Sequence, residues 1–394
     1  MQSTIDAIVS SDTDGKIVYW NRGAEHMFGY REKEVLGNSL TMLMPERFRA
    51  AHRRGIEARR LKKTSSLVGR VVELYGLKKD GSEFPMELSL CSWEANEDPY
   101  YTGIIRDTSE REKARKQLGK AAEELRIRNT AMEDDLALAR EVQESLLPQH
   151  YPVFPRTAIP GDSALRFWHL YHPSGQVGGD FFDVVALSET RAAVFICDVM
   201  GHGIRAALVT ATLRGIIEQI LSSAKDPGSF MTELNKQFMR IFKYTEREMF
   251  ASAFLLWVDA TTGETQYANA GHPSPLHLNR QHRIVEPFFF AESTRGPALG
   301  FVEDFPYATS QNYLTEHDLV MLFTDGLYEV EGPDRQEYGQ GRLVEFLRTK
   351  MDLPMEHFLD QLLADIHQFA NGNRFEDDLC LVALEVDHLV TERT

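Results

Sequence analysis

Residues 192–203 read AAVFICDVMGHG, which is six apolar residues, an aspartate and then a turn with two glycines. Apolar runs of this length that end in a glycine-containing turn are typical of buried strands. The run LVMLF (319–323) also ends close to an aspartate and a glycine, and VGGDFFD (177–183) and EDDL (376–379) each carry an aspartate beside a further apolar run. The sequence therefore places four aspartates at the ends of predicted strands: Asp180, Asp198, Asp325 and Asp377.

Carboxylates at strand ends can converge from distant parts of a chain, and hard oxygen ligands suit Mg²⁺ or Mn²⁺. Any one of these aspartates alone reads as an ordinary turn residue, because aspartate is common in turns. All four in this order indicate a metal centre.

The motifs around these aspartates follow one another from about Gln143 to Val386. They are VGGDFFDV, CDVMGHGIRAAL, NAGHPSPLHL, GPALG, LFTDGLYE and FEDDLCLVAL. In this combination the chain resembles the metal-dependent PPM serine/threonine phosphatases, in the bacterial branch typified by SpoIIE and RsbU. The resemblance implies that residues 148–394 form an α-β-β-α sandwich of the α+β class, with two Mn²⁺ or Mg²⁺ ions at one edge of the sheets.

The resemblance also implies a role for each aspartate. Asp198 would bridge both ions, and Asp180 would ligate one of them, so these two residues are the expected catalytic pair. The backbone carbonyl of Val199 would join the shell, and Asp325 and Asp377 would ligate the other ion.

Several polar neighbours of these residues have simpler interpretations. Asp183 and Asp378 are expected to support the ligands or face solvent, and His272 to shape a turn. His202, between two glycines, and Arg205, after them, are expected to be structural and solvated, respectively.

Residues 1–108 alternate short strand-like and helix-like segments, with the hairpin signal DTDG (12–15) between two apolar runs. The segments IDAIVSSDTDGKIVYWN, FGYREKEVLG, LKKDGSEFPMELSL and YTGIIRDTSERE resemble a PAS domain. Within it, MPERFRAAHRRG (44–55) is similar to the region where haem PAS domains of the FixL type place the axial histidine, which makes His52 a candidate haem ligand. The same motif also occurs in PAS domains without haem, so the sequence leaves open whether this domain binds haem or not.

Residues 109–147 lose almost all Gly, Pro and aromatic residues and carry a seven-residue repeat. One core position holds Leu118, Leu125, Met132, Ala139 and Leu146, and the other holds Ala122, Asn129, Leu136 and Gln143. This pattern predicts a coiled-coil linker and a homodimer. A solitary amphipathic helix packed on its own domain is the alternative.

Charge and cysteine usage narrow the classes of function. Residues 148–394 hold 19 basic and 34 acidic residues, so they carry a net charge of −15 out of −16 for the chain. Such a segment would repel nucleic acid and anionic membranes, so neither is an expected partner. The sequence lacks an apolar run long enough for a membrane span, and its three cysteines are scattered, which predicts a cytoplasmic protein without disulfides.

These observations predict a PAS-regulated phosphatase that removes phosphate from phosphoserine or phosphothreonine on a protein partner. By resemblance, the partner is a STAS-domain anti-sigma factor antagonist supplied in trans, in bacterial stress signalling. The competing class is a signalling scaffold whose phosphatase-like domain only binds a partner, and the presence of all four aspartates disfavours it.

Overall fold

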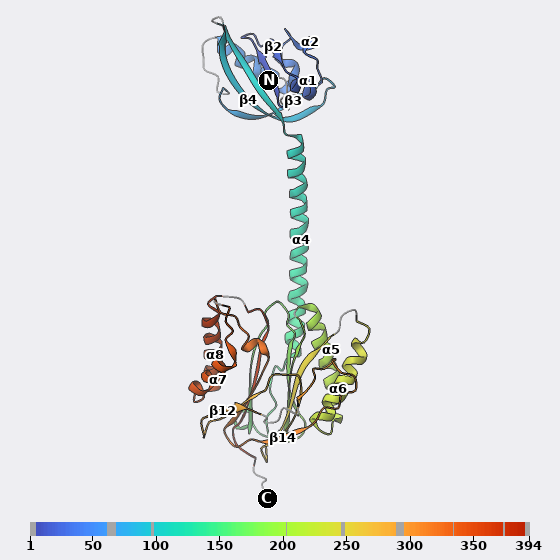
Figure 1. Cartoon of the computed structure of the whole chain (residues 1–394), viewed down its shortest axis with the longest axis vertical. Coiled ribbons are helices and arrows are strands. Elements are labelled where there is room, and N and C mark those ends of the chain that lie inside the picture. Colours follow the sequence, from blue (N-terminus) through green and yellow to red (C-terminus); the bar gives the residue numbers. More distant parts are fainter. Residues whose placement is uncertain are drawn as a thin grey trace. The chain divides into compact units, whose positions relative to one another are not determined.

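The chain folds into two units, Met1–Thr130 and Ala131–Thr394, and the helix α4 (Ser109–Leu146) belongs partly to each. Figure 1 shows the whole chain in this computed structural model. For residues 58–60 only the backbone is described. The structure describes residues 5–60, 68–95, 98–201, 203–245, 249–288, 295–333, 335–372 and 375–390.

The first unit is built on an antiparallel sheet of five strands in the order β2-β1-β5-β4-β3. The strands are β1 (Ala7–Ser11), β2 (Ile17–Trp20), β3 (Val71–Leu77), β4 (Glu83–Ala95) and β5 (Asp98–Asp107). The helices are α1 (Arg22–Phe28), α2 (Glu32–Val35), the short 3₁₀ helix η1 (Leu40–Leu43) and α3 (Glu46–Arg60). The strands predicted from the sequence are confirmed, and β4 runs six residues beyond its predicted end at Ser89.

The local sequence is sufficient to set where helix α1 begins and ends. Asn21 caps its first turn, where the side-chain oxygen accepts a hydrogen bond from the Ala24 amide at 2.8 Å. Gly29 ends the helix with a φ of 78°, a left-handed conformation that glycine adopts without a steric penalty.

The helix predicted over residues 109–147 is observed as α4. Leu118, Leu125 and Met132, which share one position of the repeat, are 74%, 60% and 58% exposed. An apolar row left open in a single chain is what a dimeric seam would require, and the coiled coil stays a prediction.

The second unit is a sandwich of two sheets between two pairs of helices (Figure 1). Helices α5 (Ile204–Ile220) and α6 (Pro227–Phe242) lie against the first sheet, and α7 (Gly339–Lys350) and α8 (Met355–Ala370) lie against the second. This confirms the expected α-β-β-α architecture. Helix α7 was not predicted from the sequence.

The first sheet has the order β13-β10-β9-β8-β7, and β14 also pairs with β10; the second has the order β12-β11-β15-β16-β6. The first contains β7 (Asp180–Ala186), β8 (Arg191–Val199), β9 (Ala251–Asp259), β10 (Glu264–Ala270), β13 (Arg295–Gly296) and β14 (Ser310–Tyr313). The second contains β6 (Leu165–His172), β11 (Leu276–Asn279), β12 (Ile284–Pro287), β15 (Asp318–Phe323) and β16 (Leu379–Val386). Further 3₁₀ turns are η2 (Pro160–Asp162), η3 (Leu221–Ser223) and η5 (Asp325–Leu327).

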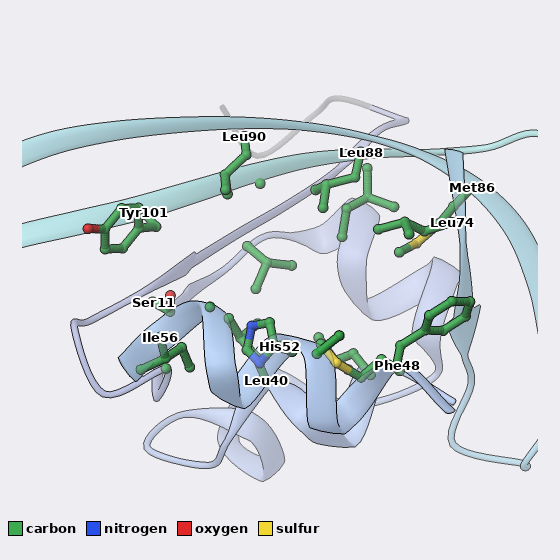
Figure 2. Close-up of a pocket in the computed structure, with 18 of the residues that line it drawn as sticks. Ser11, Leu40, Phe48, His52, Ile56, Leu74, Met86, Leu88, Leu90 and Tyr101 are labelled. Atoms are coloured by element: carbon green, nitrogen blue, oxygen red, sulfur yellow. The ribbon is translucent and has the colours of Figure 1, made fainter. Parts of the chain in front are cut away.

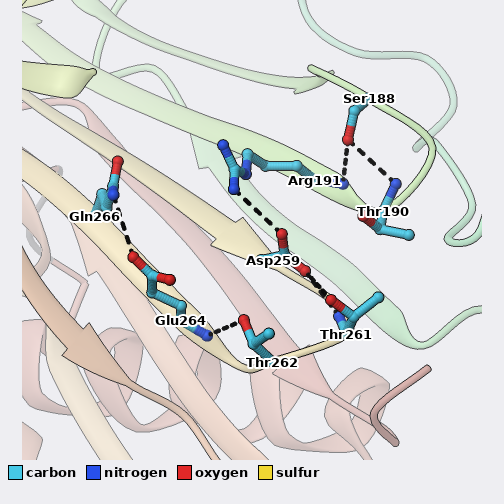
Figure 3. Close-up of polar contacts among 8 residues, drawn as sticks. All are labelled: Ser188, Thr190, Arg191, Asp259, Thr261, Thr262, Glu264 and Gln266. Carbon is cyan, nitrogen blue, oxygen red and sulfur yellow. Dashed lines mark hydrogen bonds and ion pairs between the residues drawn. The ribbon is translucent and has the colours of Figure 1, made fainter. Parts of the chain in front are cut away.

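Strand β8 is fixed at its first residue by polar contacts (Figure 3). Arg191 lies opposite Asp259 of β9, and the two side chains form an ion pair at 3.3 Å. The Asp259 carboxylate also accepts a hydrogen bond from the Thr261 amide at 2.9 Å, and Ser188 accepts one from the Arg191 amide at 3.1 Å. These contacts hold the end of β8 that lies farthest along the strand from Asp198.

In the described part of the chain, no helix combines the length and the apolar character needed to cross a membrane.

Candidate functional site

Asp180 and Asp198 face one another across two adjacent strands. Asp180 is the first residue of β7, Asp198 is the last but one of β8, and the antiparallel register pairs them directly. Directly paired residues in an antiparallel sheet have side chains on the same face, about 5 Å apart. Two carboxylates predicted from separate motifs are therefore brought together by a single strand pairing.

The second sheet brings its aspartates to the same edge. Asp325 begins η5 after β15, and Asp377 lies two residues before β16. Thr324 links the two sheets, because its hydroxyl donates a hydrogen bond to Asp180 at 2.7 Å and accepts one from the Cys380 amide at 3.1 Å. Sequence reasoning missed Thr324, although it lies within the LFTDG motif.

Burial, and then the charge of neighbouring carboxylates, raises the pKa of three of these aspartates. Burial, and then the charge of Asp198, raises the pKa of Asp180 well above its ordinary value. Burial, and then the charges of Asp325 and Asp377, raises the pKa of Asp198 to about 7. Burial, and then Asp377, also raises the pKa of Asp325. Buried like charges need a counter-ion to stay ionised together, so this edge fits a divalent cation.

Among the described residues, no three His, Cys, Asp or Glu side chains are arranged as a metal-binding group. The grouping of the four aspartates rests on strand register, on the Thr324 bridge and on the charges of Asp325 and Asp377, which contribute to the raised pKa of Asp198.

The glycine pair before Asp180 is required by close packing. A Cβ on Gly179 would lie 2.6 Å from the Val199 carbonyl oxygen, and a Cβ on Gly178 would lie 2.6 Å from an Asp378 carboxylate oxygen. A side chain at residue 179 would require a backbone shift, and one at residue 178 would displace the Asp378 carboxylate. The Val199 carbonyl, the proposed backbone ligand, therefore lies against the turn that positions Asp180.

Comparison with known proteins identifies this unit. A family model described as Stage II sporulation protein E (SpoIIE) matches residues 188–387, slightly more than half of the chain. The chain belongs to the SpoIIE family. A PAS domain model matches residues 5–110. Both resemblances inferred from the sequence motifs are thereby confirmed.

Individual relatives cover one part of this SpoIIE-family chain or the other. Phosphoserine phosphatase RsbP of Bacillus subtilis is 25% identical over 256 residues, which is 64% of this chain and 58% of RsbP. Sensor protein FixL of Bradyrhizobium diazoefficiens is 33% identical over 144 residues, 36% of this chain and 28% of FixL. The solved SiaA-PP2C domain of Pseudomonas aeruginosa is 22% identical, with a TM-score of 0.56 over 65% of this chain and 98% of that domain, and it shows that the fold is shared.

The side chain of Gln143 lies in a different environment from the one predicted for it. The repeat assigned it to the coiled-coil seam, but it is 7% exposed and its side chain enters the phosphatase-like unit. Its amide nitrogen donates to the Gly178 carbonyl at 2.8 Å and to the Thr210 hydroxyl at 3.3 Å, and its amide oxygen accepts from the Gly178 nitrogen at 3.0 Å. The seam assignment is therefore wrong for Gln143, because buried backbone groups at the site recruit its amide.

Asp378 supports the turn from the other side. Its carboxylate accepts hydrogen bonds from the Gly179 amide at 2.5 Å and from the Ser174 amide at 2.7 Å. A carboxylate that is buried and already bonded to two backbone amides is suited to positioning Asp180 rather than to binding an ion.

The other polar neighbours have structural partners too. Asp183 is buried and forms an ion pair with Arg214 of α5, and burial is the main cause that raises its pKa. His272 is fully buried, and its Nδ1 lies 2.8 Å from the Ser252 hydroxyl, opposite Asp198 in the sheet. Burial, and then Arg295, lowers the pKa of His272 to about 3, so the ring is neutral near pH 7 and poorly suited to proton transfer. Arg205 is exposed, as expected, and His202 lies outside the described residues.

The PAS unit contains a cavity of about 450 Å³, within the size range of small-molecule sites (Figure 2). Its walls are mainly aliphatic and aromatic, with Phe48, Leu88 and Leu90 among them, and the imidazole of His52 extends from α3 into the lining. Among the described lining residues there is no lysine or arginine. The cavity therefore offers an imidazole and apolar walls to a ligand, and from those residues no cation that would pair with acidic groups on it.

Proposed function

We propose that this chain is a PAS-regulated, metal-dependent phosphatase that hydrolyses phosphoserine or phosphothreonine on a protein partner. The observation that carries the proposal is the direct pairing of Asp180 with Asp198, with Asp325 and Asp377 contributed to the same edge by the second sheet. The match to the SpoIIE family and to a relative named phosphoserine phosphatase supports the same activity.

The proposed metal ligands are the carboxylates of Asp180, Asp198, Asp325 and Asp377 and the carbonyl of Val199. Two Mn²⁺ or Mg²⁺ ions held there would neutralise the phosphoryl oxygens and lower the pKa of the attacking water. Residues of the chain itself orient the Asp180 carboxylate. Thr324 fixes one oxygen of Asp180 by a hydrogen bond, and the glycine turn sets the first residue of β7.

We infer that the physiological substrate is a phosphorylated STAS-domain anti-sigma factor antagonist, encountered in the cytoplasm, and that the output is bacterial stress signalling. The resemblance of the sequence motifs to the SpoIIE and RsbU branch supports this inference, and the relative RsbP is named a phosphoserine phosphatase. We also propose that two chains pair through the exposed row of Leu118, Leu125 and Met132, because a continuous apolar row on a helix is stabilised by a second helix.

For the PAS cavity we propose a haem ligated by His52, on the strength of the similarity of residues 44–55 to haem PAS domains of the FixL type and the position of His52 in the cavity wall. Purified protein should then show a strong visible absorption band that is lost in His52→Ala. A colourless protein after expression with added haem would eliminate this ligand and leave the phosphatase proposal intact.

Hydrolysis of p-nitrophenyl phosphate tests the proposed reaction. Activity should require added Mn²⁺ or Mg²⁺ and vanish in excess EDTA, because carboxylate sites bind these ions reversibly. Full turnover in excess EDTA would overturn the metal-dependent mechanism. No turnover with either ion would favour a scaffold that only binds a partner.

A further inference from the structure

A groove of about 670 Å³ lies beside the aspartate edge, between α6 and the loop over residues 299–304. Lys236, Arg240 and Lys243 line it from the α6 side, and the aromatic rings of Phe250 and Phe301 lie in its wall. The two rings pack edge to face with their centroids 5.5 Å apart, and Phe301 is still 66% exposed. We refer to this surface as the α6 groove.

The α6 groove is joined directly to the strand that carries Asp198. The Phe250 carbonyl accepts a hydrogen bond from the Met200 amide at 3.0 Å, and Met200 is two residues beyond Asp198. Ala251, next to Phe250, pairs with Val199 in the sheet. A partner in the groove would therefore lie next to the proposed metal centre.

The far wall of the groove is also held in place. Asn235 of α6 is fully buried, accepts a hydrogen bond from the Gly300 amide at 2.8 Å and donates one to the Val302 carbonyl at 2.9 Å. A single buried side chain thus ties the loop to the helix, so the surface exists before any partner binds.

The charge of the groove differs from that of its surroundings. Lys236, Arg240 and Lys243 are all exposed, and within the described residues none has an ion-pair partner, whereas residues 148–394 carry a net charge of −15. Glu303 and Asp304 line the loop side, so the positive charge is confined to the α6 side of the groove. Three exposed cations that have no ion-pair partner in the described part of the chain, beside the exposed ring of Phe301, complement a partner that is both acidic and apolar.

We propose that the α6 groove docks the protein substrate through acidic and apolar residues next to the phosphorylated side chain. This inference rests on the proposed phosphatase function and adds the class of substrate to it. The phosphoryl group would occupy the aspartate edge while the flanking residues contact Arg240, Lys243 and Phe301. A small phosphate ester, which has no flanking residues, would gain nothing from the groove.

Two synthetic phosphoserine peptides test the inference, one flanked by Glu and Leu and the other by Lys and Gly, with p-nitrophenyl phosphate as a third substrate. Wild type should hydrolyse the acidic peptide with a kcat/KM about tenfold above that of the basic peptide at low salt. The preference should shrink at high salt, because screening weakens contacts between exposed charges.

The double variant Arg240→Glu/Lys243→Glu should lose the preference by a rise in KM for the acidic peptide, with turnover of p-nitrophenyl phosphate unchanged. The matched control is Arg348→Glu/Lys350→Glu, which makes the same change of charge at the end of α7, on the other sheet. It should retain the preference. Phe301→Ser provides a second, uncharged test, because a side chain this exposed is dispensable for folding.

The outcomes separate the two proposals. Wild-type peptide preference in both Arg240→Glu/Lys243→Glu and Phe301→Ser would overturn the docking inference while leaving the phosphatase proposal in place. Failure of wild type to hydrolyse p-nitrophenyl phosphate with Mn²⁺ would overturn the phosphatase proposal itself. An equal loss of preference in the α7 control would show that total charge, and not the α6 groove, selects the substrate.

Discussion

Replacing Gln143 by leucine should weaken metal binding at a site to which Gln143 contributes no ligand. The Gln143 amide satisfies both the nitrogen and the carbonyl of Gly178 from inside the unit. Leucine has a similar volume and favours the helix equally well, so α4 should persist. The two backbone groups would lose their partners while the turn stays in its present position.

The size of the effect follows from those two groups. A buried polar group left unpaired costs about 1–3 kcal/mol, so the present position of the turn becomes less favourable by about 2–6 kcal/mol. Asp378 still holds Gly179, so the turn would shift locally instead of unfolding. If the two unpaired groups cost about 3 kcal/mol, the turn conformation that binds metal is populated roughly a hundredfold less than in wild type. The apparent metal affinity then falls by the same factor.

The assay is a Mn²⁺ titration of p-nitrophenyl phosphate hydrolysis by wild type, Gln143→Leu and Gln219→Leu. The last makes the same chemical change at an exposed position of α5 and should behave as wild type. Gln143→Leu should need far more Mn²⁺ for half-maximal rate and keep its helical circular dichroism. A half-maximal Mn²⁺ concentration within a factor of two of wild type would refute the reasoning.

Three further outcomes are expected. Asp183→Asn should lower the free energy of unfolding by about 3 kcal/mol in urea titration, because Arg214 loses its buried partner, and should leave the Mn²⁺ response unchanged. The metal-free protein should lose stability as pH rises from about 4 through 7. The raised pKa of Asp198 means that the folded state binds the proton more tightly than the unfolded state does. Thermal melts with EDTA across that pH range check the direction. Leu125→Glu/Met132→Glu should convert a dimer into a monomer in light scattering, and a wild-type monomer at micromolar concentration would dismiss the coiled coil.

Local patterns were sufficient for much of the fold. The apolar run before Asp198 is β8, the predicted last strand coincides with β16, and Asn21 and Gly29 cap α1 as their residue types predict. Each of these signals lies within a few neighbouring residues. Helix α7 escaped prediction because Gly339 and Gly341 weaken its helical pattern at the start.

The roles of several residues around the site could not be predicted from the sequence, because these roles depend on long-range contacts. Gln143 fits a heptad position, and nothing local shows that its amide is needed by Gly178, which lies 35 residues away. Asp183 and Asp378 stand beside proposed ligands in the sequence, but their roles depend on Arg214 and on Gly179. A single sequence gives the type of these residues, and only the packed structure gives their partners.

Mn²⁺ binding to wild type and to Asp198→Asn, measured by isothermal titration calorimetry, tests the central claim most directly. Asp198 is paired with Asp180 and is the proposed bridging ligand, so the variant should retain its folded circular dichroism and lose most of the binding heat and turnover. Wild-type Mn²⁺ affinity and hydrolysis in a folded Asp198→Asn variant would contradict the account.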